Sequence, residues 1–161
     1  MNTTVNEIME KTLIYTIKEA SELSGLPEST LRYYETIGLL GPINRGSTSK
    51  QREYTERNID EAISIACLNA TGMSIEDMRA YLGNRTQGVV GARDQVALLE
   101  NHTGRLADEA YYLQLRQRYV DTKISYWKAV AEEDSEQAQA MSKNAKLIAK
   151  ELKFTREKLG Q

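Results

Sequence analysis

Hydrophobic and polar positions near the start of the chain follow a helical spacing that glycine and proline interrupt. Thr16 is followed three residues later by Glu19, the spacing of a capping box at a helix start. Apolar residues then recur at helical intervals as far as Gly25, which suits a helix end. Pro27 and Gly38 suit the start and the end of a second short helix. Two short helices joined by a glycine-containing turn predict a helix-turn-helix.

The next segment alternates short polar runs with turn residues. Gly41, Pro42, Gly46 and a Ser/Thr cluster separate two runs that are short enough to be strands. This composition predicts a hairpin with a flexible tip, which is called a wing when it follows a helix-turn-helix.

Two more helices are predicted after the wing. Thr55 can cap a helix over residues 56–70, and Ser74 can cap a short helix that ends near Leu82. One apolar face is expected on the first of them, made of Ile59, Ala62, Ile63, Ala66, Cys67 and Ala70. Residues 83–92 are rich in glycine and are expected to be a linker.

Beyond residue 92 the hydrophobic positions repeat every seven residues. The repeat and its companion positions predict a coiled-coil dimerisation helix over residues 93–132. The expected dimerisation residues are Val96, Leu99, Leu106, Leu113, Val120, Ile124 and Trp127. Because this stripe would be exposed in a single chain, we expect the helix to need a partner. Residues 133–161 are expected to form a helical tail that packs on the long helix or on a second chain.

Charge and composition narrow the functional classes. The net charge of −2 and the pI near 5.6 disfavour a broad electrostatic attraction to nucleic acid. The predicted wing is nevertheless locally basic, because it holds Arg45, Lys50 and Arg52. No apolar run reaches the roughly 20 residues of a membrane span. Residues 1–14 are expected to be a mobile lead-in without a secretory signal, so a cytoplasmic protein without membrane contact is expected.

The segment "STLRYYETIGLL" carries the candidate chemistry. Thr30, Arg32, Tyr33 and Tyr34 lie in the second helix of the predicted helix-turn-helix, the helix that enters the major groove of DNA. Arginine can bind guanine or a phosphate, and hydroxyl groups can donate to phosphates. The alternative is that the tyrosines pack in the core and that Arg32 pairs with Glu28 or Glu35. At least one of the tyrosines is expected to point inward.

With one histidine and one cysteine, no catalytic set can be assembled from the sequence, so no enzyme and no cofactor are expected. A thiolate metal site is not expected either, because residues 112–161 contain no cysteine. The remaining alternative to DNA binding is a coiled-coil adaptor that interacts only with proteins.

The segments "YTIKEASELSGLPESTLRYYETIGLL" and "REYTERNIDEAISIACLNATGMSIEDMRAYL" resemble the mercury-resistance-regulator (MerR) family of bacterial transcription factors. The resemblance implies a mostly α fold, with a winged helix-turn-helix DNA-binding head over residues 15–82, a long dimerisation helix in an antiparallel coiled coil, and a short C-terminal helix. It implies that Arg32, Tyr33, Arg52 and Tyr54 contact double-stranded DNA, with Arg45 nearby in the wing. Lys50 departs from the usual family pattern and adds a phosphate-binding charge.

The family's mechanism implies a dimer that distorts a promoter spacer so that RNA polymerase can use misaligned promoter elements. Size and a single cysteine resemble the subgroup linked to aldehyde or thiol stress, which makes Cys67 a candidate redox sensor for an electrophile inducer. The alternative is that Cys67 is a buried, inert hydrophobic residue. A small apolar inducer bound between the aromatic stretch around Trp127 and the tail is a further alternative.

Overall fold

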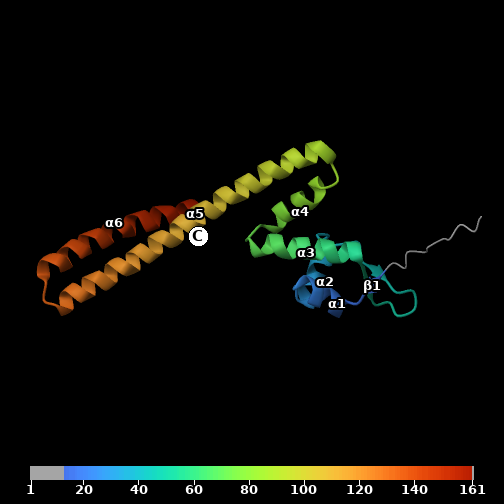
Figure 1. Ribbon diagram of the computed structural model, residues 1–161, viewed down its shortest axis with the longest axis horizontal. Coiled ribbons are helices and arrows are strands. Elements are labelled where there is room, and N and C mark those ends of the chain that lie inside the picture. Colours follow the sequence, from blue (N-terminus) through green and yellow to red (C-terminus); the bar gives the residue numbers. More distant parts are fainter. Residues whose placement is uncertain (1–12, 161) are drawn as a thin grey trace, which may run out of the picture. The chain divides into compact units, whose positions relative to one another are not determined.

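The computed structural model describes residues 13–160, which are mostly helical (Figure 1). In chain order the elements are β1 (Ile14–Tyr15), α1 (Ile17–Ser24), α2 (Glu28–Thr36), β2 (Asn44–Arg45), β3 (Arg52–Thr55), α3 (Glu56–Ala70), α4 (Ile75–Asn84), α5 (Gly88–Ala131) and α6 (Ser135–Leu159). The chain divides into two compact units, Met1–Gln95, called the head below, and Val96–Gln161, called the hairpin. Among the described residues, no helix is both long and apolar enough to cross a membrane.

The predicted capping box and helix-turn-helix boundaries are confirmed. The Glu19 amide donates to the Thr16 hydroxyl at 3.3 Å, and the Glu19 carboxylate accepts from the Thr16 amide at 2.7 Å. Hydrogen bonds to this carboxylate from the Thr16 amide, the larger contribution, and from the Thr16 hydroxyl lower the pKa of Glu19. Helix α1 stops at Gly25, whose φ of 73° is left-handed, and α2 follows directly after Pro27. Local sequence therefore sets the turn between the two helices.

The wing forms as predicted, but the sheet has a third strand. Strands β2 and β3 are antiparallel, and β1 pairs with the other edge of β3, giving the order β1-β3-β2. Ile14 pairs with Thr55, so the prediction of a mobile lead-in is wrong for this residue. The rest of that lead-in, apart from Leu13, lies outside the described residues. Sequence reasoning missed β1 because a two-residue strand carries no periodicity of its own.

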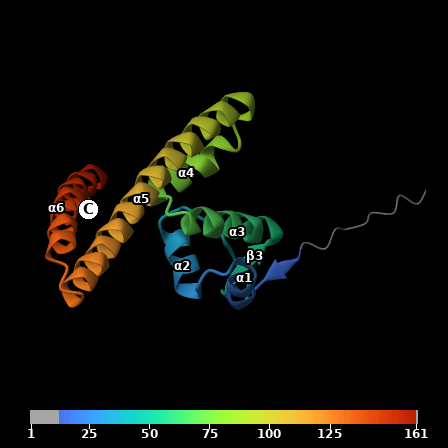
Figure 2. The ribbon, with the colours of Figure 1, turned by 60° about the vertical axis from the view of Figure 1, so that its left-hand side comes forward.

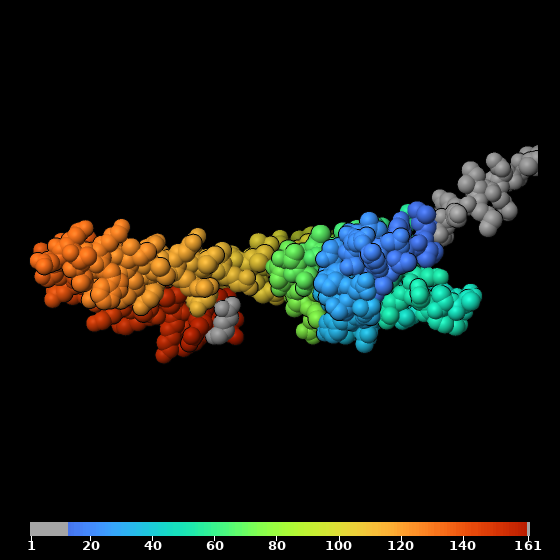
Figure 3. Space-filling view, turned by 90° about the horizontal axis from the view of Figure 1, so that it is seen from below, coloured from blue at the N-terminus to red at the C-terminus, as the bar shows by residue number. Residues whose placement is uncertain are grey.

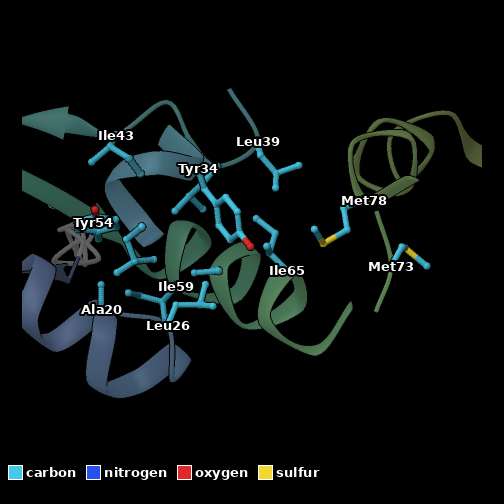
Figure 4. Packing of buried hydrophobic residues seen from close by; sticks show 13 residues of the cluster. Ala20, Leu26, Tyr34, Leu39, Ile43, Tyr54, Ile59, Ile65, Met73 and Met78 are labelled. Atoms are coloured by element: carbon cyan, nitrogen blue, oxygen red, sulfur yellow. The ribbon is translucent and has the colours of Figure 1, made fainter. Parts of the chain in front are cut away.

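A single core closes the head (Figure 4). Buried side chains come from α1, α2, the wing, α3 and α4, and the residues fully or almost fully enclosed include Ala20, Leu31, Leu39, Ile65 and Met78. Leu31 and Leu39 point inward. Leu23 is half exposed, because Ala20 and Ser24 form the buried face of α1.

Helices α3 and α4 begin at the predicted caps, where Thr55 accepts from the Asn58 amide and Ser74 from the Asp77 amide. The inward face of α3 is, however, rotated from the predicted one. Asn58, Ile59, Ala62 and Ile65 are the buried side chains of α3, whereas Ile63 and Cys67 are exposed. The alternative of Cys67 as a buried residue is therefore wrong.

Seven of the ten residues of the predicted linker, 83–92, are helical. Helix α4 continues to Asn84 and α5 begins at Gly88. A Cβ placed on Gly91 would collide with the Asn84 carbonyl oxygen, which no flexible movement of a side chain would relieve. At Gly91 the absence of a side chain thus permits a close approach of the two helices, and the glycine does not mark a flexible linker.

Helices α5 and α6 form the antiparallel hairpin, in which α6 lies along α5 (Figures 1, 2 and 3). Leu115, Thr122 and Ala129 of α5 are buried, as are Ala145 and Ile148 of α6. The pair is tied by an ion pair between Lys158 and Asp108 at 3.0 Å and by a hydrogen bond from the Tyr111 hydroxyl to Glu151. Of the two predicted positions for the tail, the structure has the one against the long helix of the same chain.

Candidate nucleic-acid interface

The second helix of the helix-turn-helix, α2, presents two of its large polar side chains outward. Arg32 is exposed and Tyr33 is 50% exposed, while Thr30 is partly exposed. Leu31 and Tyr34, three residues apart, face the core. The helical period therefore separates neighbouring residues of "LRYY" between the protein interior and the outer surface.

Tyr34 is a core residue, which corrects its prediction as a DNA contact. Its side chain is 5% exposed and lies beside Leu39 and Ile65 (Figure 4). Burial, with a smaller contribution from Tyr33, raises the pKa of the Tyr34 hydroxyl. The centroids of the two tyrosine rings lie 5.8 Å apart, so the buried Tyr34 ring packs against the exposed Tyr33 ring. This is the inward tyrosine that the sequence leads us to expect.

The wing supplies three cationic side chains. Arg45 on β2 and Lys50 in the turn are exposed, and Arg52 on β3 is partly exposed. Lys50 has a left-handed backbone with φ of 57°. A Cβ on Gly46 would meet Ser49 Oγ and come 2.7 Å from Glu53 Oε1, so these two flexible side chains would have to turn aside.

Glu35 of α2 joins the wing arginines to the helix. Its Oε1 accepts from Arg45 Nη2 at 2.8 Å and its Oε2 from Arg52 Nε at 2.5 Å. The Glu35 side chain is only 18% exposed, so these are partly desolvated, charge-assisted contacts. From the sequence, Glu35 is expected only as a partner for Arg32; its contacts with the wing are not predicted, because these partners are ten and seventeen residues away.

Arg32 instead pairs with Glu28, one turn earlier in α2, at 3.3 Å. Both side chains are more than 40% exposed. An exposed pair of this kind contributes little stability, so it leaves Arg32 available to a phosphate or a base.

Tyr54 is fully buried, which argues against its predicted contact with DNA. Its hydroxyl has no hydrogen-bond partner within the part of the chain that the structure describes. Burial raises the pKa of this hydroxyl, Glu35 raises it further, and Arg52, Arg32 and Arg45 act against them. These charged groups of α2 and the wing therefore lie near enough to the buried Tyr54 hydroxyl to shift its pKa.

The predicted dimerisation residues are all exposed in the single chain. Val96, Leu99, Leu106, Leu113, Val120, Ile124 and Trp127 are between 38% and 60% exposed. Two residues after Leu113, Val120 and Trp127 come the buried residues of α5, namely Leu115, Thr122 and Ala129. Two residues turn a helix by roughly 200°. This stripe, called the seam below, therefore lies on the side of α5 away from α6.

An apolar depression of about 490 Å³ lies on the seam near its C-terminal end. Its lining residues, between Tyr119 and Ala131, all belong to α5. No residue of α6 lines this depression, so it does not support the alternative of an inducer pocket between this aromatic stretch and the tail. Within residues 13–160, no group of three or more His, Cys, Asp or Glu side chains is placed to hold a metal ion.

A winged helix-turn-helix with exposed cations on its second helix and its wing is the architecture of a DNA-binding protein. A family model described as "MerR HTH family regulatory protein" matches residues 15–84. The chain is 33% identical to the HTH-type transcriptional regulator HmrR of Rhizobium leguminosarum, across 67% of this chain and 71% of HmrR. The chain belongs to the MerR family, whose members are transcriptional regulators and not enzymes.

Two further comparisons agree. An uncharacterized HTH-type transcriptional regulator of Bacillus subtilis, YyaN, is 43% identical over 44% of this chain, and the match spans only 50% of YyaN. The crystal structure of HiNmlR, described as a MerR family regulator lacking the sensor domain and bound to promoter DNA, superimposes with a TM-score of 0.55 at 27% identity. That match covers 80% of this chain and 96% of HiNmlR. The comparisons thus support a DNA-binding regulator over a protein-only adaptor.

Proposed function

We propose that this protein is a homodimeric transcription regulator that binds an inverted-repeat promoter site in the bacterial cytoplasm and distorts the spacer between promoter elements for RNA polymerase. The observation that carries the proposal is that α2 exposes Arg32 and Tyr33, while Glu35 of the same helix binds Arg45 and Arg52 of the wing.

The DNA contacts follow from exposure and chemistry. Arg32 is suited to a guanine edge or a phosphate, and Thr30 and Tyr33 are suited to donate to phosphates. Arg45, Lys50 and Arg52 are suited to the backbone beside the groove. Tyr34 and Tyr54 drop out of the proposed contact set, because their side chains are buried.

The homodimer follows from the seam. Seven apolar side chains at coiled-coil spacing lie uncovered along α5, which is unfavourable for a single chain in water. A second copy presents the same stripe, so an antiparallel pairing of two α5 helices covers both. Two heads linked in this way bind two half-sites, and their combined contacts can supply the energy that DNA deformation costs, of order 1–6 kcal/mol.

The test is selection of bound duplexes from a random pool by the purified protein. We expect an inverted repeat with a fixed distance between half-sites. Arg32→Ala should weaken binding to that repeat at least about tenfold and leave the dimer intact, because each good arginine contact is worth roughly 1–3 kcal/mol. A dimer that selects no sequence would instead favour the adaptor alternative.

A second candidate function is control by an electrophile through Cys67. The observation that favours it is that Cys67 is exposed on α3, where a reagent can reach its sulfur. Titration of the DNA complex with an aldehyde or a quinone should change its affinity in the wild type and not in Cys67→Ser. An equal response in both proteins would exclude this role.

A further inference from the structure

Arg45 and Arg52 stand directly opposite each other in the two-stranded ladder of the wing. Like charges at opposed positions of neighbouring strands repel each other and destabilise the pair. Here one carboxylate lies between them, since Glu35 accepts from Arg45 with one oxygen and from Arg52 with the other. The arrangement converts a repulsive pair into a three-membered cluster with a formal charge of about +1.

The position of Glu35 on α2 orients the two wing arginines toward that helix. Glu35 lies on α2, one turn after Arg32, so both arginines of the wing are held toward the helix proposed to enter the groove. Each of the two guanidinium groups donates one charge-assisted hydrogen bond to Glu35 and so loses part of its rotational freedom before DNA arrives. An unheld arginine reaches any phosphate nearby, whatever the sequence.

We propose that Glu35 is a positioning residue for DNA recognition, whose carboxylate fixes the directions of Arg45 and Arg52 and so increases selectivity for the correct base sequence. The proposal rests on the proposed function. Glu35 also competes with phosphate for the same two arginines, which lowers affinity for DNA of random sequence. Binding to DNA weakens the hydrogen bonds of Arg45 and Arg52 to Glu35. Selectivity arises because only a duplex that places its phosphates and base edges correctly replaces them.

The experiment compares dissociation constants for the selected repeat and for a random duplex of equal length, at several salt concentrations. Glu35→Gln removes the carboxylate and should raise affinity for random DNA several-fold while the ratio of specific to random affinity falls about tenfold. Glu22→Gln is the matched control, since it makes the same change of charge on an exposed side chain of α1. It should leave the ratio unchanged. Equal ratios in the two variants would overturn the proposal.

A second variant and a direct signal separate positioning from a purely structural role. Glu35→Asp keeps the charge but is one methylene too short to reach both arginines, so the ratio should fall without a gain in random affinity. In the free wild-type protein, the Nε–H signal of Arg52 should be resolved by NMR and protected from exchange, and Glu35→Gln should abolish that protection. An unprotected wild-type signal, or an unchanged ratio in Glu35→Asp, would also contradict the proposal.

The controls distinguish a failure of the proposed function from a failure of the proposed role of Glu35. If the wild type selects no duplex at all, the proposed function fails. If the wild type is selective and the Glu35 variants behave as Glu22→Gln does, only the role of Glu35 fails.

Discussion

The head and the hairpin differ in how completely they cover their own apolar surface. Within its described part, the head encloses thirteen hydrophobic side chains, contributed by α1 to α4, the wing and the turns between them. The hairpin buries one face of α5 against α6 and leaves the opposite face, with seven large apolar residues, in contact with solvent. A unit that is complete by itself needs no partner, whereas one with an uncovered stripe does. The difference supports the proposal that the head folds without a partner and that the hairpin mediates association.

The largest effect is expected in the head core. Ile65→Ala should lower the free energy of unfolding by about 2–5 kcal/mol, because Ile65 is completely buried and the truncation leaves a cavity. Ile63→Ala on the same helix is the control, since Ile63 is 39% exposed and should cost far less. Urea denaturation followed by circular dichroism measures both. Equal losses of unfolding free energy in the two variants would contradict the burial of Ile65 in the core.

These two isoleucines also show what sequence can predict. Helix N-caps depend on residues at most a few positions apart, such as Thr16 with Glu19, and the structure has the predicted caps at Thr16, Thr55 and Ser74. Which side of α3 faces inward depends on the elements packed against it, so Ile63 and Cys67 were placed on the wrong face.

Contacts between segments that are distant in the sequence could not be predicted for the same reason. The pairing of Ile14 with Thr55 joins residues 41 positions apart, and the bridge from Glu35 to Arg52 spans seventeen. The family resemblance supplied the wing arginines, but the carboxylate between them required the fold. The heptads of α5, in contrast, predicted the seam, because their period is a local property of one helix.

The next effect is expected in the hairpin. Replacing Leu106 and Leu113 together by Asp should raise the dissociation constant of the dimer at least about 100-fold, or about 3 kcal/mol, because the charges would be buried in the seam. Leu147→Asp is the control, since Leu147 of α6 is 64% exposed and lies outside the seam. Sedimentation at several concentrations measures the association. The double variant should unfold in its head at the same urea concentration as the wild-type head. A stable dimer of the double variant would refute the seam.

The smallest effect concerns the start of α1, and it depends on pH. Hydrogen bonds from Thr16 lower the pKa of Glu19 below its usual value of 4.5, so the folded protein holds this proton less tightly than the unfolded chain. The stabilisation is therefore fully present above about pH 4.5 and is lost as the pH falls through the lowered pKa. Exchange of the Thr16 amide proton, measured by NMR, should accelerate in that acidic range. Glu19→Gln cannot ionise, so its exchange should show no such step once the intrinsic effect of pH is removed. Since the step belongs to one helix start in the head, the association of the hairpin should not follow it, and a dimer that dissociates with the same midpoint would mean that the two units are not independent.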